Sequence, residues 1–192
     1  MDARALVFKH RGALLALPAV ALAIFGKPSA ASVALGIPLA LAGEAIRIWA
    51  VGYSGVTTRS DTVTAPELVT AGPYAYVRNP LYLGNFITAL GFALGFTGGN
   101  APLSRLALVG LSLGTMVAVY ATIVPHEEAY LRETFGTRFE EYAARVPRTL
   151  PQLVPAQPEV GRYDPSVIAR AESRTFATFG AMLGLLLLKA AL

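Results

Sequence analysis

Five apolar segments alternate with polar stretches along the chain, at about residues 12–26, 30–52, 82–98, 106–124 and 175–191. An α-helix needs about 20 apolar residues to cross a hydrocarbon core of about 30 Å. Several of these segments are shorter, so we expect tilting or flanking residues that complete the span. The pattern predicts an all-α fold, a polytopic membrane bundle of about five transmembrane helices.

Short connections join neighbouring segments. Lys27-Pro28 separates the first two, and a turn rich in glycine at 97–102 separates the third from the fourth. Such connections predict tight helical hairpins. Pairs of glycines four residues apart predict close packing of helices inside the membrane. These pairs are Gly91 with Gly95, Gly110 with Gly114, and Gly180 with Gly184.

The two long polar stretches, 53–80 and 125–174, are predicted to lie on the inner side of the membrane. In the second, apolar residues recur every three or four positions, which is typical of amphipathic helices. These residues are Leu131, Phe135, Phe139, Tyr142 and Val146. We therefore expect two short amphipathic cytosolic helices beside the bundle.

Local signals predict where these polar helices begin and end. Gly136 can end a first helix, and Thr137 with Glu140 has the capping-box spacing that opens a second. Asp164-Pro165 has the form of an N-cap followed by a first-turn proline, which predicts a helix leading into the last span.

Composition agrees with a membrane protein. Hydrophobic residues make up 54% of the 192 residues and charged residues only 15%, and the mean hydropathy is +0.52. These values lie outside those of ordinary soluble domains, so lipid is the expected solvent for much of the surface. We treat residues 1–192 as a single membrane domain. Glu44 and Arg47, three apart in the second segment, are predicted to compensate each other's charge within the membrane.

Basic residues predict the orientation through the positive-inside rule. With a cytoplasmic N-terminus, thirteen of the sixteen basic residues fall inside. They are Arg4, Lys9, Arg11, Arg47, Arg59, Arg78, Arg132, Arg138, Arg145, Arg148, Arg162, Arg170 and Arg174. Only Lys27, Arg105 and Lys189 fall outside, which predicts N-in and C-out in the cell inner membrane. A cleaved signal peptide over residues 1–30 is the alternative, and the four further apolar segments favour a retained first helix.

Several function classes lack the residues they need. The chain has no cysteine, which excludes disulfides, thiolate metal sites and thiol nucleophiles. Its two histidines, His10 and His126, are far apart in sequence, so no metal centre or serine hydrolase triad is expected. The net charge of +4 comes without a basic run, so nucleic acid is not an expected partner.

Three groups of chemically capable residues converge on the predicted inner face. The first is a proline-rich turn at 72–84 with Tyr74, Arg78 and Tyr82, and the others are Glu127-Glu128 and the segment 142–148. Taken singly, these residues fit an interfacial aromatic belt, the positive-inside rule, or acidic charges in the first turn of a helix. Together, an acidic pair facing an arginine supplies the opposite charges that hold a zwitterionic small molecule.

These motifs resemble a known family. GPYAYVRNPLYLG at 72–84 and HEEAYLRETFGTRFEEYAARVPRTLP at 126–151 are similar to the isoprenylcysteine carboxyl methyltransferases and the related phospholipid methyltransferases. The resemblance covers about residues 40–151 and leaves 156–192 as a C-terminal extension with the last span. It implies a membrane enzyme that binds S-adenosylmethionine near the cytosolic surface, with a lipid or prenylated substrate entering from the bilayer.

The resemblance also implies which residues form the site. Cofactor binding is expected from Tyr74, Arg78, Asn79, Pro80, Tyr82, Leu83, Gly84, Glu127, Glu128 and Tyr142. Catalytic roles are expected for Arg78, Glu127, Glu128 and Arg148. Pro147 and Arg148 belong to the closing segment of the motif. Asn79 stands where most members have histidine, so an amide or a water must replace any imidazole contact. Residues 119–125 lack an arginine expected before the acidic pair, which weakens the case for binding a substrate carboxylate.

The methyl acceptor stays open between two chemistries. A sulfonium methyl is already activated, so an enzyme mainly has to align a nucleophile behind it and exclude water. O-methylation of a carboxylate needs no general base, and Arg78 or Arg148 can position the acceptor. N-methylation of an amine or phospholipid is the alternative, with Glu127 or Glu128 as the base. A membrane reductase and a non-enzymatic scaffold or accessory protein are the other classes.

Overall fold

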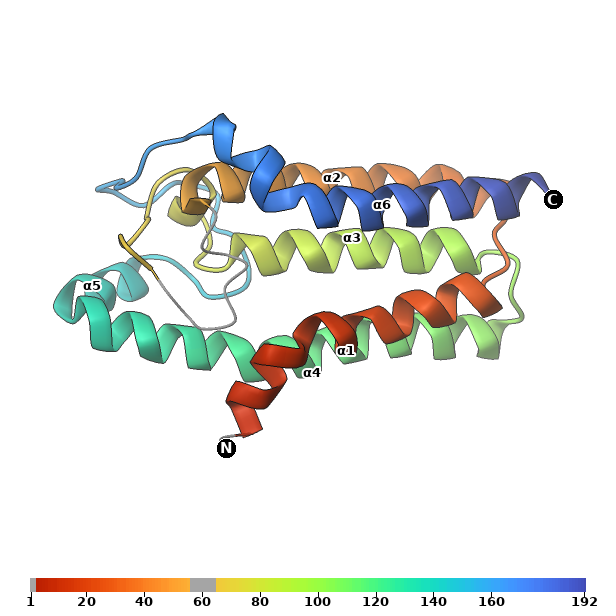
Figure 1. Cartoon of the computed structure of the whole chain (residues 1–192), viewed down its shortest axis with the longest axis horizontal. Helices are drawn as coiled ribbons and strands as arrows, with labels where there is room; N and C mark the ends of the chain where they lie inside the picture. The colour runs from red at the N-terminus through yellow and green to blue at the C-terminus, as the bar shows by residue number, and fades with distance from the viewer. Residues whose placement is uncertain (1–2, 56–64) are drawn as a thin grey trace.

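The computed structural model describes residues 3–55 and 65–192 (Figure 1). Arg59, one of the basic residues predicted for the inner side, lies outside them. The helices are α1 (Ala3–Phe25), α2 (Ala30–Ser54), α3 (Pro80–Thr97), α4 (Pro102–Phe135), α5 (Thr137–Arg145) and α6 (Ile168–Ala191). Two short 3₁₀ turns, η2 (Gly72–Ala75) and η3 (Pro165–Val167), precede α3 and α6. The described residues form no strand, which confirms the all-α prediction.

Four helices are long and apolar enough to cross a membrane, namely α2, α3, α4 and α6 with its preceding turn. The apolar part of α1 is shorter and covers His10–Phe25. The five predicted segments therefore appear as four spans by length and a shorter fifth apolar helix. At 34 residues, α4 exceeds the roughly 20 residues that a span needs, so one end of it extends beyond the membrane.

The helices form two layers along the long axis of the molecule (Figure 1). α1 lies against α4, and α2 lies against α3 with α6 beside them. α1 begins toward the end of the bundle that carries α5, and α6 finishes at the opposite end. The described chain therefore begins and finishes toward opposite ends of the bundle.

Glycines set the distance between α2 and α3. A Cβ atom added at Gly36 would meet the carbonyl oxygen of Gly91 at 2.5 Å, and one added at Gly91 would meet the backbone nitrogen of Ala40. Such close backbone approach is how membrane helices associate without a hydrophobic driving force. The packing role predicted for Gly91 and Gly95 is therefore confirmed. Within this chain it is wrong for the other two pairs, because nothing lies within 4 Å of a Cβ at Gly110, Gly114, Gly180 or Gly184.

The two predicted hairpins close against each other at the end of the bundle away from α5. The backbone amide of Gly99 donates to the carbonyl of Lys27 at 2.6 Å. The Asn100 side chain accepts from the Lys27 amide at 2.7 Å and donates to the Phe25 carbonyl at 2.9 Å. Lys189 of α6 donates its Nζ to the carbonyl of Ala23 at 2.7 Å, so the last helix is tied to the same end.

The polar helices differ from the prediction at their starts. α4 continues through Pro125 to Phe135, so the glutamate pair lies inside a continuous helix and not in the first turn of a separate one. The Thr137–Glu140 capping box is wrong: Gly136 is the N-cap of α5, with φ +52°, and it has no side chain to cap with. The Asp164 cap is confirmed, since its carboxylate accepts from the Ser166 amide at 2.9 Å, although it caps η3.

Candidate functional site

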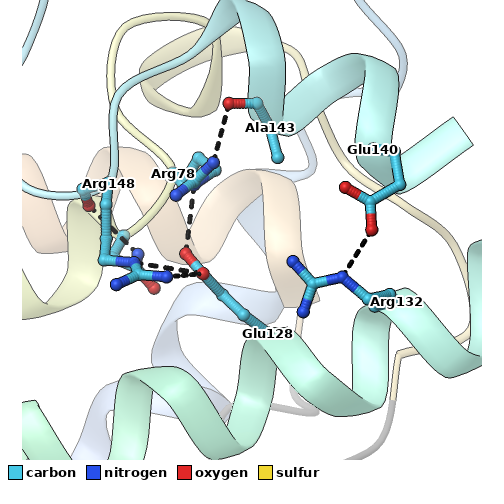
Figure 2. Close-up of polar contacts among 7 residues, drawn as sticks. Arg78, Glu128, Arg132, Glu140, Ala143 and Arg148 are labelled. Carbon is cyan, nitrogen blue, oxygen red and sulfur yellow. Dashed lines mark hydrogen bonds and ion pairs between the residues drawn. The ribbon is translucent and has the colours of Figure 1, made fainter.

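Glu128 is the centre of the charged site at the α5 end of the bundle (Figure 2). Its side chain is buried, at 5% exposure, and pairs with two arginines from distant segments. Arg78 approaches through Nε at 3.0 Å from Oε1, and Arg148 through Nη2 at 2.6 Å from Oε2. Arg78 also donates Nη1 to the carbonyl of Ala143 at 2.8 Å. Charge-assisted contacts of this kind are strong, and they hold the three predicted motifs together.

Backbone geometry delivers Arg78 to this position. Gly72, the first residue of the 3₁₀ turn η2, adopts φ +61°, a conformation that glycine tolerates, and Pro73 follows it in the first turn. Pro80 then begins α3 at a position where its missing N–H costs nothing. Between them, the Arg78 amide donates to the Pro147 carbonyl at 2.9 Å, so the turn and the closing segment are bonded directly.

Asn79 takes part in the same junction. It is the N-cap residue of α3, and its Nδ2 donates to the carbonyl of Arg148 at 3.0 Å. The Asn79 amide thus bridges the two motifs within the chain.

Glu127 has different partners from its neighbour. Tyr82 donates its hydroxyl to Oε1 of Glu127 at 2.6 Å, and the Tyr82 ring packs on that of Tyr120 with centroids 4.5 Å apart. Arg11 of α1 acts electrostatically on this carboxylate. Successive residues of a helix point about 100° apart, and here Glu127 is directed to Tyr82 while Glu128 is directed to Arg78. The acidic pair expected to face Arg78 is therefore divided, and Glu128 alone contacts it.

Tyr142 of α5 and Tyr74, which belongs to the turn η2, stabilise this part of the site. Tyr142 is buried in a cluster with Leu68, Phe139 and Val146, and its hydroxyl donates to the Tyr74 carbonyl at 2.8 Å. Burial raises the pKa of the Tyr142 phenol well above its ordinary value. Burial also raises the pKa of Tyr74 to about 12, against the opposing effect of a hydrogen bond with Ser54. Both phenols are thus neutral at physiological pH and act as hydrogen-bonding supports.

Arg148 gives the site an open side. Its side chain is 49% exposed while it contacts Glu128. The hydrogen bond to that carboxylate raises the pKa of the guanidinium, so its charge is permanent. Of the two arginines on Glu128, Arg148 is the one whose remaining N–H groups can reach a bound molecule.

The other residues expected at the cofactor site lie along α3. Pro80 is fully buried at the start of the helix, and the Leu83 amide donates to the Asn79 carbonyl. Gly84 faces α2, where a Cβ would meet the Gly43 carbonyl oxygen at 2.7 Å. These three positions orient the first turns of α3.

A second polar network lies inside the bundle. The predicted pairing of Glu44 with Arg47 is confirmed, at 3.5 Å. Arg47 also pairs with Glu172 of α6, at 2.5 Å, and donates to the side-chain oxygen of Asn85 on α3. Neither Glu172 nor Asn85 was predicted as a partner of Arg47. Glu172 falls in the polar stretch 125–174, between Arg170 and Arg174, and nothing local indicates that α6 turns it inward.

A cavity of about 240 Å³ lies beside this network, between the two layers of helices. Glu44, Arg47, Asn85 and Tyr120 belong to its lining, together with four hydroxyl side chains and with apolar residues of α1, α3, α4 and α6. The hydroxyl side chains are those of Thr88, Ser112, Thr175 and Thr178. Such a combination of apolar walls with a few polar groups is typical of small-molecule sites. No group of three or more histidine, aspartate or glutamate side chains among the described residues is placed to hold a metal ion.

The fold and the site define a polytopic helical membrane protein with a buried arginine–glutamate centre at one end of its bundle. The model of the phospholipid methyltransferase family matches residues 31–138, and the chain belongs to this family. This confirms the resemblance found in the sequence. All of α1 and α6 lies outside the matched residues, as do Tyr142 and Arg148.

Curated relatives carry two kinds of name, metal-resistance proteins and isoprenylcysteine O-methyltransferases. A nickel-cobalt-cadmium resistance protein, NccN of Alcaligenes xylosoxydans xylosoxydans, is 31% identical over 62% of this chain and 48% of its own length. The protein-S-isoprenylcysteine O-methyltransferase of Schizosaccharomyces pombe is 39% identical over 46% of this chain and 34% of its own length. A probable protein-S-isoprenylcysteine O-methyltransferase of Oryza sativa subsp. japonica is 32% identical over 61% and 60%. The chain spans about half the length of the first of these relatives. No solved structure matches this chain.

Proposed function

We propose that this protein is an S-adenosylmethionine-dependent methyltransferase that acts on a lipid-like acceptor within the membrane. The observation that carries the proposal is the convergence of Arg78 and Arg148 on Glu128, which joins both family-like motifs at one end of the bundle. Twelve of the thirteen basic residues assigned to the inner side lie in the described part of the chain, and the positive-inside rule supports a cytoplasmic location for this end.

The residues present suit the charges of S-adenosylmethionine. Its amino-acid part is zwitterionic, so it needs a cation and an anion a short distance apart. Arg148 offers N–H donors on its exposed side, and Glu127 offers an acceptor beside Tyr82. Glu128 is held by its two arginines, which suits a positioning role. When bound, the cofactor supplies an already activated methyl group, and the protein has to orient the acceptor and keep water out.

We assign part of the lipid acceptor to the cavity between the helix layers. Its apolar walls suit the hydrocarbon part of a lipid, and its polar side at Arg47 and Asn85 lies near Tyr82, which contacts Glu127. We propose O-methylation of a carboxylate as the first reading, because curated relatives are named isoprenylcysteine O-methyltransferases. Carboxylate attack needs no general base. N-methylation of an amine is the second reading, favoured by the Glu44 carboxylate that lines the cavity.

Cofactor binding is tested by titrating the purified protein in detergent with S-adenosylhomocysteine, followed by isothermal calorimetry. We expect saturable binding to one site. Replacing Glu127 by glutamine removes the anion that would hold the ammonium group. The dissociation constant for S-adenosylhomocysteine is expected to be about tenfold higher for Glu127→Gln than for the parent protein, equivalent to about 1.4 kcal/mol.

The matched control is Glu133→Gln, because Glu133 lies on the same helix and is exposed. It is expected to bind S-adenosylhomocysteine like the parent protein, and both variants are expected to stay monodisperse. Absence of any binding by the parent protein favours a scaffold or accessory role. Equal affinity of the parent and of Glu127→Gln for S-adenosylhomocysteine would show that Glu127 does not contact the cofactor.

A further inference from the structure

Three large aliphatic side chains stand exposed in the segment that follows α5. Leu150, Leu153 and Val154 are 77%, 97% and 73% exposed, although the chain around them is held firmly. A cluster of apolar side chains on a polar face of a protein marks a surface that contacts a partner or a membrane. The contacts and charges around this segment, residues 149–155, indicate whether it contacts a protein partner or a membrane.

The base of segment 149–155 is bonded to the turn that precedes α3. The Gln152 amide donates to the Tyr76 carbonyl at 3.0 Å, and its side-chain Nε2 donates to the Ala75 carbonyl at 3.0 Å. The Ala156 amide donates to Ala75 as well, at 2.9 Å. Pro151 and Pro155 stiffen the backbone on both sides of Gln152. With Gln152 turned toward the protein, its apolar neighbours are presented outward at little cost in conformational entropy.

These contacts fix the depth of the segment relative to the membrane. α3 has only 18 residues, all of which are needed to cross a hydrocarbon core, so Asn79 at its N-cap marks the membrane boundary. Asn79 is bonded to the Arg148 carbonyl, directly before segment 149–155. Tyr76 packs beside Trp49 of α2, with ring centroids 6.1 Å apart, and such aromatic residues are typical of the interface. The exposed leucines therefore lie level with the head groups.

Charge around the segment favours anionic lipid. Arg145 and Arg148 precede it and Arg162 follows it, and all three are exposed. Glu159 is the one acidic residue between positions 145 and 162. Basic side chains beside exposed apolar ones are the combination by which proteins bind the surface of an anionic bilayer.

We propose that residues 149–155 form an interfacial loop that inserts Leu150, Leu153 and Val154 into the head-group region of the surrounding bilayer. The flanking arginines contact anionic phosphates of the same leaflet. Because Arg148 also binds Glu128, the loop connects the lipid surface to the charged site. This contact with lipid would be made at the polar end of the bundle, whereas α1 and α6 would contact lipid along their apolar lengths.

The test places a fluorescent reporter in the loop of the full-length chain. The protein has one tryptophan, so Leu153→Trp is made in a Trp49→Phe background and reconstituted into vesicles of phosphatidylcholine with phosphatidylglycerol. We expect blue-shifted emission and at least twofold quenching by lipids brominated near the top of the acyl chain. We also expect less quenching by aqueous iodide than for the control, Glu141→Trp, an exposed position on α5.

Val154→Trp provides a second reporter if Leu153→Trp folds poorly. Iodide quenching of both reporters equal to that of Glu141→Trp would overturn the proposal. So would a reporter shielded from both iodide and brominated lipid, since a protein surface would then cover the loop. Weaker lipid quenching in vesicles without phosphatidylglycerol is expected from the contribution of the arginines.

Discussion

Replacing Glu128 by glutamine is expected to lower the free energy of unfolding by about 3 kcal/mol, the scale of removing one partner from a buried ion pair. The side chain is 5% exposed and its partner Arg78 is 12% exposed, so the guanidinium would stay buried without its counter-charge. The contact with Arg148 adds less, because that side chain is half exposed. Thermal or denaturant unfolding in detergent, followed by the intrinsic tryptophan fluorescence, measures the loss.

The chain offers a matched control in Glu140→Gln. Glu140 also pairs with an arginine, Arg132, but both side chains are more than half exposed (Figure 2). Surface pairs contribute about 0–1 kcal/mol, so this variant is expected to unfold nearly like the parent. Equal losses in Glu128→Gln and Glu140→Gln would show that burial of the Arg78 pair contributes nothing. Because Arg78 is part of this support, Arg78→Ala is expected to destabilise the protein as well as weaken cofactor binding, which makes Glu127→Gln the cleaner probe of the cofactor.

Replacing Gly91 by alanine is expected to destabilise the α2–α3 pair by about 1–3 kcal/mol, the usual cost of overpacking. The new Cβ would meet backbone atoms of Ala40 and Gly36, which cannot move aside as a flexible side chain can. The helices would have to separate, and the site that they position would shift with them. Thermal unfolding of the detergent-solubilised protein and its monodispersity on gel filtration report the effect.

Gly110→Ala is the corresponding control. A Cβ at Gly110 meets nothing within 4 Å, so this helix should tolerate alanine, whose helix propensity is the higher of the two. A loss at Gly110 as large as that at Gly91 would contradict the assignment of Gly91 to the packed interface. It would point instead to a contact made by the outer face of α4.

Much of the fold was predictable because it depends on local patterns. The apolar segments at 30–52 and 82–98 became α2 and α3 almost residue for residue, since a membrane span requires a continuous apolar run whatever its neighbours are. The prolines and glycines at 97–102 indicated the hairpin for the same reason. The motif around Arg78 and the glutamate doublet was recognisable from residue types and order, and these residues do lie close together.

Contacts between segments distant in the sequence could not be predicted in this way, because no local pattern indicates them. Three glycine pairs share the same spacing, yet only Gly91 and Gly95 face a neighbouring helix, because spacing shows that residues share a face and not what lies opposite. The division of the glutamates was decided by the direction of α4, which continues past Pro125. Glu172 became a partner of Arg47 only when α6 packed against α2.

The sequence by itself thus determined the helices, the membrane environment and the residue types of the site, because hydropathy and backbone chemistry act within a few residues. The tertiary structure decided which charges meet, which glycines are crowded and that segment 149–155 is bonded to the turn before α3. Those outcomes depend on the rotation and depth of whole helices, and these are set by packing between segments up to 166 residues apart.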